Sequence, residues 1–539
     1  MMPLRNKLAA LALTTLAALP GTAAAQEQPQ RGGILRYTVG GDAPSLDGHR
    51  DSTFTVVHLV APFYSTLIRI DPANAASTTA FVCDLCTEIP KPTDDGKKYG
   101  FPIRRDVKFH DGTPLTAKDV VASYQKMVFP PPGLPSARKG LFTMVEKIEA
   151  PDDFTVEFTL KYPTPTFIPA VATPQNFIYP KSKLDADPRW FEKNVLGSGP
   201  FKYVSYETGR SMTGVRNDDY FIKGLPYLDG FEAIIAPKES VRMQAIRGDR
   251  AATEFRGIPP KARDELVTAL GNKIEVQELD WNCAFALTPN HKAKPFDDPR
   301  VRRAVTLAID RWGGSKYLSE IAILKTVGGV VFPKAPIAAS KEELEKIPGY
   351  WPDLQKSRAE ARRLLAEAGV KTPLKVVLNN RATDQPYKTL GTWIIDQLRH
   401  IGMEVTQQEK PSGVFFDSLR TKKDWDLTIE FLCPSIVNPV ADISKFRSDD
   451  LSADNYGAYH DRELDSLYER LNRTQDPDEQ VKLMRAFEKR VLDEEMHTAI
   501  LLWMYRIVAY RSYMRGWQIS PSHHINQDLS TVWIDKSKL

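Results

Sequence analysis

The sequence predicts an α/β protein that folds as two hinged lobes. The first half of the chain alternates apolar and polar residues as strands do, whereas the second half repeats a unit of helix, glycine and strand. The 539 residues exceed what one hydrophobic core usually supports, so we expect more than one lobe. No linker of biased composition separates the halves. We therefore expect the chain to cross between the lobes more than once and to form a hinge there.

The first 25 residues have the order of a secretory signal peptide. Two basic residues precede an apolar run from Leu8 to Leu19, and Ala23-Ala24-Ala25 supplies the small residues expected before a cleavage site. The apolar run is too short to span a bilayer comfortably. The first cysteine is Cys83, so no cysteine near the site offers an attachment point for a lipid. We expect a mature protein that begins at Gln26 and is free in the periplasm.

The charge and composition exclude several classes of protein. Of the formal net charge of +4, Arg5 and Lys7 contribute two, which leaves +2 for the mature chain. A nucleic-acid binder would show a strongly basic face, so we expect no nucleic-acid partner. Hydrophobic residues make up 42% of the chain and form no further long apolar run, which indicates a globular protein outside the membrane.

Several local patterns define elements in the first half. Pro130-Pro131-Pro132 and Pro135 predict an exposed loop, because proline cannot donate a hydrogen bond to a sheet. The segment from Asp153 to Lys161 alternates in polarity and predicts a strand with one face on a core. Gly197-Ser198-Gly199 predicts a tight turn before a strand from Phe201 to Val204.

The second half has helical spacing of apolar residues, with glycines placed to end the helices and strands after them. An Asp-Pro pair also marks the start of a later helix as a cap and first-turn residue. The predicted elements are, in order, a helix at 358–369, a strand at 374–378, a helix at 393–401 ending at Gly402, a strand at 403–405, a helix beginning at Asp476-Pro477, and a strand at 498–510.

Four cysteines in an exported chain are expected to form disulfides, because the compartment is oxidising. Cys83 and Cys86 form a Cys-x-x-Cys motif, while Cys283 and Cys433 lie far apart in the sequence. The motif also fits a redox pair or half a zinc site. No second Cys-x-x-Cys and no Cys-x-x-Cys-His is present, which disfavours zinc and covalent haem.

The sequence lacks the common catalytic motifs. Gly-x-x-x-x-Gly-Lys, His-Glu-x-x-His and Gly-x-Ser-x-Gly are all absent. His110-Asp111 has no identifiable nucleophile to serve, so we expect His110 to bond to nearby backbone in a turn. We expect His523-His524 to be a solvated pair, since adjacent residues on a strand face opposite ways. We therefore expect no enzyme activity, no cofactor and no metal.

One stretch identifies a family. The residues from Arg105 to Val120, which include Phe109-His110-Asp111-Gly112-Thr113-Pro114-Leu115, resemble the signature of the family 5 extracellular solute-binding proteins of ABC importers, the dipeptide, oligopeptide and nickel receptors. Further similar blocks follow in the family's order along nearly the whole mature chain. They are Pro44-Ser45-Leu46-Asp47, Gly197 to Phe201, Pro295 to Arg302, Ala308 to Arg311, Pro348-Gly349-Tyr350, and the helix that ends at Ala368-Gly369.

The resemblance implies a periplasmic-binding-protein fold in which two hinged lobes are built from three intertwined domains. The expected boundaries are a signal peptide at 1–25, domain I at 26–66 with 190–282 and 500–539, domain II at 67–189, and domain III at 283–499. A small-molecule or peptide ligand would be enclosed between the lobes and passed to a membrane permease with a separate ATPase. We expect the receptor to be a monomer.

The resemblance also implies the position of the ligand. In oligopeptide-binding relatives, a cysteine before the Pro-Phe-Asp-Asp block pairs with a later cysteine beside the ligand, which corresponds here to Cys283 with Cys433. Trp281 and Phe431 fit a plain apolar core equally well. The implied contacts near the two cysteines are Trp281, Asn282, Cys283, Phe431, Leu432, Pro434, Ser435 and Asn438.

The sequence departs from the peptide-receptor pattern at one position. Relatives that hold a free peptide amine use an aspartate two residues after the second cysteine, and Ser435 stands there in this chain. A hydroxyl cannot neutralise a buried ammonium. Asp442 would have to take that role after a rearrangement of its loop, and Arg381 either meets an anionic group or is solvated.

Two other functions therefore stay open beside a peptide-like or other polar organic cargo. Within the family, the alternative is a receptor for a sugar, an opine or a metal chelate. Outside it, the alternative is an exported hydrolase or a redox protein that uses Cys83 and Cys86.

Overall fold

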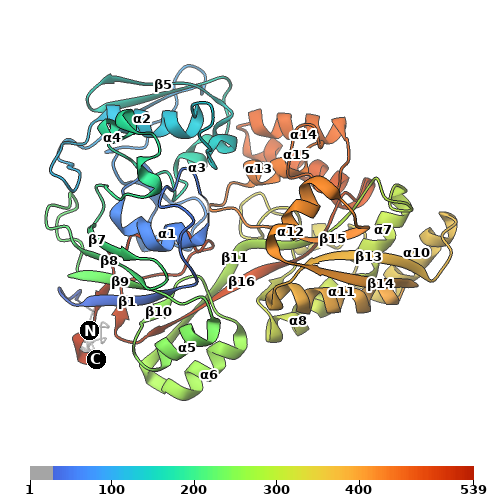
Figure 1. Cartoon of the computed structure of the whole chain (residues 1–539). Helices are drawn as coiled ribbons and strands as arrows, with labels where there is room; N and C mark the ends of the chain where they lie inside the picture. Colours follow the sequence, from blue (N-terminus) through green and yellow to red (C-terminus); the bar gives the residue numbers. More distant parts are fainter. Residues whose placement is uncertain (1–27, 52) are drawn as a thin grey trace, which may run out of the picture.

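The protein consists of two lobes that share one large sheet (Figure 1). The computed structural model describes residues 28–51 and 53–539, apart from the side chains of residues 384, 412 and 413. The expected signal peptide lies outside the described residues. No helix in the described part of the chain has both the length and the apolar character needed to cross a membrane.

Two long antiparallel strands form the middle of the sheet and run from one lobe into the other. They are β11 (Ile274–Pro289) and β16 (Ala499–Arg511), paired from Ile274↔Arg511 to Leu287↔Ala499. β16 is buried along its whole length, as its apolar sequence predicts. Because both strands belong to both lobes, the chain crosses between the lobes here, as expected of a hinged protein.

The remaining strands of the large sheet flank this pair on either side. In the first lobe they follow β16 in the order β10 (Thr253–Glu254), β1 (Ile34–Val39), β9 (Gly230–Ile235), β8 (Ser211–Arg216) and β7 (Phe201–Glu207). In the second lobe they follow β11 in the order β15 (Leu427–Leu432), β13 (Leu374–Arg381) and β14 (Met403–Lys410), and β12 (Leu324–Thr326) pairs with β16. The β13–β14, β13–β15, β1–β9 and β1–β10 pairs are parallel.

A smaller α/β unit sits on the first lobe and has its own apolar core. Its three-stranded sheet has the order β4 (Lys98–Pro102), β6 (Thr155–Leu160), β5 (Val145–Asp152), with a separate pair β2 (Ile68–Ile70) and β3 (Phe81–Cys83). Its helices are α2 (Ala117–Val128), α3 (Phe167–Val171) and α4 (Lys181–Ala186). Thr116 starts α2 with a capping box, since its backbone N–H donates to Asp119 Oδ2 at 2.8 Å.

The first lobe has short helices and a tail that returns to it. α1 (Phe54–Val60) packs in the core with the strands around β1, while α5 (Glu239–Arg247) and α6 (Pro260–Leu270) lie at the far end of the lobe in Figure 1. After β16, the chain adds the hairpin β17 (Met514–Arg515) and β18 (Trp533–Ile534).

In the second lobe, helices cover both faces of the sheet, which gives two separate apolar cores. One face carries α7 (Pro299–Ala308), α8 (Arg311–Ile321), α10 (Leu354–Glu367) and α11 (Thr389–Arg399). The other carries α13 (Pro439–Asp442), α14 (Arg462–Arg473) and α15 (Pro477–Lys489). Two short helices, α9 (Lys341–Leu344) and α12 (Ser412–Asp417), complete the lobe.

The local patterns in the sequence correspond to these elements. Gly369 and Gly402 follow α10 and α11 with φ angles of +70° and +85°, which is the left-handed conformation that glycine provides at a helix end. The side chain of Asp476 accepts a hydrogen bond from Glu479 N at the start of α15. The predicted strand around residues 153–161 is β6, whose apolar residues are buried in alternation.

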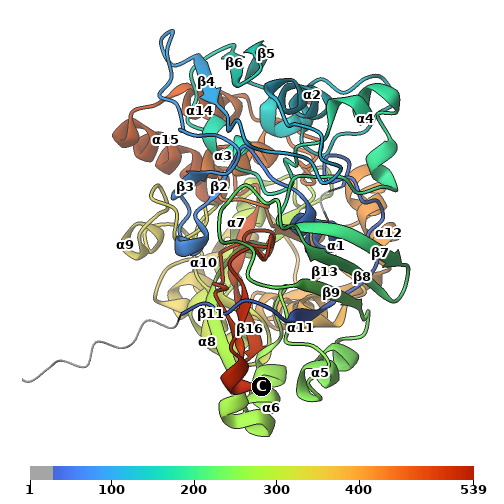
Figure 2. The same cartoon turned by 90° about the vertical axis from the view of Figure 1, so that its left-hand side faces the viewer.

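The two lobes touch along the edge opposite the shared strands. Thr164 Oγ1 donates to Asn472 Oδ1 at 3.1 Å, and Asn472 Nδ2 donates to Tyr162 OH at 2.9 Å. Asn438 Nδ2 donates to Thr166 O at 3.0 Å. Figure 2 shows α14 and α15 beside β4, and the hydrogen bonds above join the smaller α/β unit to the second lobe.

Candidate ligand-binding site

Three distant segments of the chain meet at the side chain of Gln175. Gln175 follows α3, Ser435 follows β15, and His524 lies in the tail after β16. Gln175 Nε2 donates to Ser435 Oγ at 3.0 Å and lies 3.2 Å from His524 Nδ1. We call Gln175, Ser435 and His524 the junction. It brings together the three parts of the chain that the sequence assigned to separate domains.

The disulfide expected from the resemblance borders the junction. Cys283 lies on β11, and Cys433 directly follows β15; their Cα atoms are 4.1 Å apart and their sulfur atoms are bonded. The neighbouring pair Ala284↔Leu432 continues the ladder between the two strands. The disulfide therefore fixes the start of the segment that carries Ser435.

Trp281 and Asn282, in the middle of β11, contact the tail and the Ser435 segment. The Trp281 ring lies edge-on to the His523 ring, with 5.1 Å between the centroids. Asn282 N donates to Pro521 O at 2.7 Å, and Asn282 Nδ2 approaches Pro434 O at 3.5 Å. Both side chains are buried.

Several buried polar atoms around the junction have no hydrogen-bond partner among the described residues. They are Gln175 Oε1, Asn282 Oδ1 and His523 Nδ1. An unsatisfied buried group costs about 1–3 kcal/mol, so native proteins rarely leave several together. Acceptors and a ring nitrogen left in this state are suited to hydrogen bonds with a small polar molecule.

The other predicted contacts have partners outside the junction. Asn438 bridges to the first lobe through Thr166, as described above. Phe431 is half-buried, with its ring 6.2 Å from that of Phe416, whereas Leu432 faces the opposite side of β15 and packs in the apolar core with Val437. The structure thus places Leu432 in a core position, and Phe431 in an aromatic group.

Arg381 belongs to that aromatic group. It ends β13, is half-buried, and has its guanidinium carbon 5.6 Å from the Tyr387 ring and 5.5 Å from the Phe416 ring. Arg256, in the first lobe, lies 4.5 Å from the Phe54 ring. Desolvation lowers the pKa of Arg256, and the charge of Arg381 acts in the same direction. The guanidinium groups of Arg256 and Arg381, which belong to different lobes, are therefore close enough to repel each other.

Asp442 ends α13, seven residues after Ser435. It is half-buried, and Asn438 N donates to its Oδ2 at 3.1 Å. Desolvation raises the pKa of Asp442 well above its usual value, against the effect of that hydrogen bond. A cation brought close to Asp442 would favour its charged form.

Comparison with known proteins agrees with the motifs and the fold. The family model of the bacterial extracellular solute-binding proteins, family 5 Middle, matches residues 80–453. The chain belongs to this family. The curated relatives include the oligopeptide-binding protein AppA of Bacillus subtilis, 24% identical over 94% of this chain and 93% of that protein. They also include the di/tripeptide-binding protein 2 of Pseudomonas aeruginosa, 26% identical over 96% and 98%.

Solved structures show the same fold. Bacillus subtilis AppA in complex with a nonapeptide has a TM-score of 0.77 at 22% identity, covering 94% of this chain and 100% of that one. The PBP AgaA of A. tumefaciens R10 in complex with agropinic acid has a TM-score of 0.76 at 22% identity, covering 93% and 99%. Periplasmic binding proteins of the peptide-binding type therefore share this architecture.

The family block around His110 builds scaffold. His110 N donates to Gly197 O at 2.9 Å, and His110 Nε2 lies 3.0 Å from Gly199 O. The family blocks at 105–120 and 197–201 are therefore in contact. The backbone of Phe63 leaves space only for glycine at position 197, because a Cβ atom there would come within 2.1 Å of the Phe63 carbonyl oxygen.

The prediction of a solvated histidine pair at residues 523–524 is wrong. Both side chains are buried, their ring centroids are 4.1 Å apart, and burial lowers the pKa of each well below its usual value. His58 Nε2 lies 2.7 Å from His523 O. The tail folds back between the lobes, which the polar composition of residues 520–528 did not suggest. Gln175 was not among the predicted contacts, because no sequence motif includes it.

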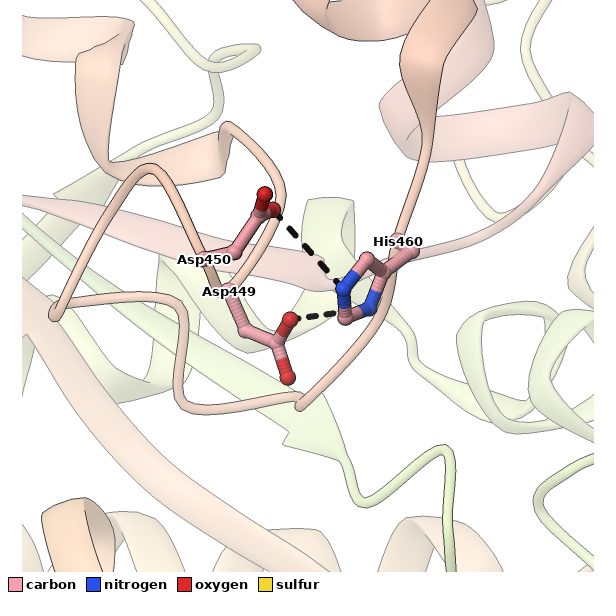
Figure 3. Close-up of side chains that lie close together, drawn as sticks. All are labelled: Asp449, Asp450 and His460. Carbon is pink, nitrogen blue, oxygen red and sulfur yellow. Dashed lines mark ion pairs between the residues drawn. The ribbon is translucent and has the colours of Figure 1, made fainter.

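One group in the described residues has potential metal ligands, and it is better explained as an ion-pair network. His460 Nδ1 lies 2.8 Å from Asp449 Oδ1, and His460 Nε2 lies 3.7 Å from Asp450 Oδ1 (Figure 3). The two ring nitrogens thus face different carboxylates. Lys292 and Arg462 also pair with these carboxylates, at 3.5 and 2.7 Å.

An open groove lies elsewhere, on the surface of the smaller α/β unit. We call it the β4–β6 groove; it is lined by Thr87, residues 102–106 and residues 152–155. Charged side chains such as Arg105 and Asp153 are exposed there. None of the unsatisfied buried atoms around the junction belongs to it.

Proposed function

We propose that this protein is the periplasmic substrate-binding receptor of an ABC importer, and that it captures a peptide-like or other polar organic solute at the junction. One observation carries the proposal. Gln175 contacts Ser435 and His524 from two other parts of the chain, while Gln175 Oε1 and Asn282 Oδ1 are buried and find no partner in the described part of the chain. A receptor that closes over a solute needs groups of this kind from both lobes.

The family and the sequence supply the remaining parts of the proposal. The leader at 1–25 would direct the chain to the periplasm, and the mature receptor would act as a monomer. It would deliver its cargo to a membrane permease whose separate ATPase subunits use the ATP. We propose the three domains with the boundaries expected from the sequence, so that domains I and II face domain III across the junction.

The chemistry of the cargo would depend on two charged side chains. Arg381, which lies among aromatic rings, would meet an anionic group, and Asp442 would meet a cationic one. Ser435 carries no charge where relatives hold a peptide amine with aspartate. The relative AgaA, solved with agropinic acid, supports an opine as the second candidate, beside a sugar or a metal chelate.

An exported redox protein is the alternative from another class. Cys83 and Cys86 are bonded to each other in the structure, with Cα atoms 4.9 Å apart. Cys86 is buried, which disfavours attack by another thiolate. Titration of thiols in the native protein should find no free thiol at Cys83 or Cys86. Two rapidly reacting thiols would favour redox chemistry.

Native mass spectrometry of the protein purified from its own periplasm tests the proposal. We expect an adduct of a small polar solute, released on denaturation and identifiable by its mass. Returning that solute at 100 times its Kd should stabilise the protein by about 2.7 kcal/mol and raise the melting temperature. A solute that is chemically converted during the incubation would contradict a receptor function.

A further inference from the structure

Side chains of the two lobes contact each other directly around Asn472, near the end of α14. Asn472 Nδ2 donates to Tyr162 OH at 2.9 Å, and Asn472 Oδ1 accepts from Thr164 Oγ1 at 3.1 Å. Thr166 Oγ1 approaches the same oxygen at 3.5 Å. Asn472, Thr164 and Thr166 are buried, and none of their polar side-chain atoms is left buried without a partner in the described part of the chain. Paired hydrogen bonds that are shielded from water stabilise this contact between the lobes.

An apolar side chain of the second lobe adds to the contact. Ile436 and Val437 are neighbours in the segment after β15, yet they pack in different lobes. Val437 lies in an apolar core of the second lobe, whereas Ile436 lies in the apolar core of the smaller α/β unit. Only 4% of Ile436 is exposed. Parting of the lobes would return this side chain to water, so its burial favours the closed form.

The smaller α/β unit also approaches the end of α14 at two further points. The guanidinium carbon of Arg473 lies 4.6 Å from the centre of the Tyr162 ring, which is a cation–π distance. Gly96 faces Gln475, and a Cβ atom at Gly96 would come within 2.8 Å of Gln475 Nε2. The close fit around Asn472 therefore extends to its neighbours in the sequence.

We infer that Tyr162, Thr164, Thr166, Ile436 and Asn472 form a latch that holds the lobes together by direct contacts, so that the closed form is the main form of the protein before a solute binds. The shared strands β11 and β16 lie at the opposite edge, so the lobes can part at the latch while these strands stay paired. The lobes would then part to admit a solute and close again over it. The inference goes beyond the proposed function, because it concerns the balance of open and closed forms for any cargo.

Single-molecule energy transfer between dyes on the two lobes tests the latch. The dyes are attached at Lys91→Cys and Lys482→Cys, two exposed positions, in protein freed of co-purified solute by dialysis in dilute denaturant. The protein with an intact latch should be mostly closed. Asn472→Ala should lower the ratio of closed to open molecules about 10- to 100-fold, because water satisfies its partners only in the open form. Asn272→Ala, at an exposed asparagine, is the matched control and should leave the ratio unchanged.

A conservative variant tests the latch from the other lobe. Tyr162→Phe removes only the hydroxyl that accepts from Asn472, so it should lower the ratio about 3- to 10-fold without risk to the fold. Added to Asn472→Ala, it should cause no further fall, because the two side chains act through one bond. A mostly open protein with an intact latch would overturn the inference, and so would an unchanged ratio in Tyr162→Phe or full additivity of the two substitutions. These results would leave the receptor function standing, since the adduct found by native mass spectrometry decides it.

Discussion

Two buried polar clusters border His49, and they differ in how fully their hydrogen bonds are satisfied. In the first, Lys126 Nζ contacts Asp47 Oδ2, and Tyr179 OH donates to Asp47 Oδ1 at 3.1 Å. His49 N donates to the same oxygen at 2.9 Å. In the second, the junction with Asn282, the side chains of Gln175 and Asn282 each keep a buried oxygen that has no partner among the described residues.

Burial does not explain the difference, because both clusters are almost fully enclosed. The Lys126 and Asp47 side chains are 6% and 2% exposed, and Gln175 is 0% exposed. In the first cluster, Asp47 has partners in Lys126 and Tyr179. The second cluster lies where three parts of the chain meet. We expect the first cluster to serve stability, and we propose that the second serves a solute.

A substitution in the first cluster should have the largest effect on stability. Lys126→Met would leave Asp47 buried without its counter-charge, and we expect the free energy of unfolding to fall by about 3–5 kcal/mol. Lys118→Met is the matched control on the same helix, because Lys118 pairs with Asp153 in an exposed position and should leave stability nearly unchanged. Urea unfolding of both variants measures this. Equal stability of the two variants would show that the Asp47 pair is not structural.

The pH dependence of stability should report on His49, which borders both clusters. Burial, followed by the charge of Lys126, lowers its pKa from 6.5 to about 3. The unfolded chain therefore takes up a proton as the pH falls below 6.5, whereas the folded protein does not until about pH 3. Stability should fall with pH in this window, and His49 should contribute about 1.4 kcal/mol per pH unit.

His49→Gln removes that contribution and keeps a donor for Phe177 O. Urea unfolding at pH 7, 6 and 5 should show a shallower loss of stability, by about one proton, than the wild type. If the variant keeps the wild-type slope, His49 is not held neutral in the folded protein.

A substitution in the second cluster, at the junction, should have the smallest effect on stability. Gln175→Leu loses the contacts with Ser435 and His524 but also removes the unsatisfied Oε1, so stability should change by about 1 kcal/mol or less. Solute binding should weaken at least about 10-fold. Gln244→Leu, on the exposed face of α5, should affect neither quantity. A large loss of stability in Gln175→Leu would place Gln175 with the structural cluster.

Much of the fold follows from local sequence signals. The glycines after α10 and α11, the aspartate before α15 and the alternation in β6 are each read from a few neighbouring residues, and the structure has the predicted element at each position. The shared strands β11 and β16 are different, because their pairing joins residues more than 200 positions apart. The missing linker predicted that the chain crosses between the lobes, but only the resemblance to a family suggested which segments belong together.

The site was less predictable for the same reason. The cysteine pair and the segment around Ser435 came from family motifs, but Gln175 belongs to no motif. His524 appeared to be a surface residue because the sequence shows its polarity and not the return of the tail between the lobes. Their roles arise only when three distant segments meet.

Hydrogen exchange of the receptor with its co-purified solute, measured with and without that solute, tests the central claim most directly. We predict slower exchange of backbone amides in two separate segments, residues 172–177 and 433–438, because the solute would hold both sides of the junction closed. Protection confined to the β4–β6 groove, with unchanged exchange in these two segments, would contradict the account.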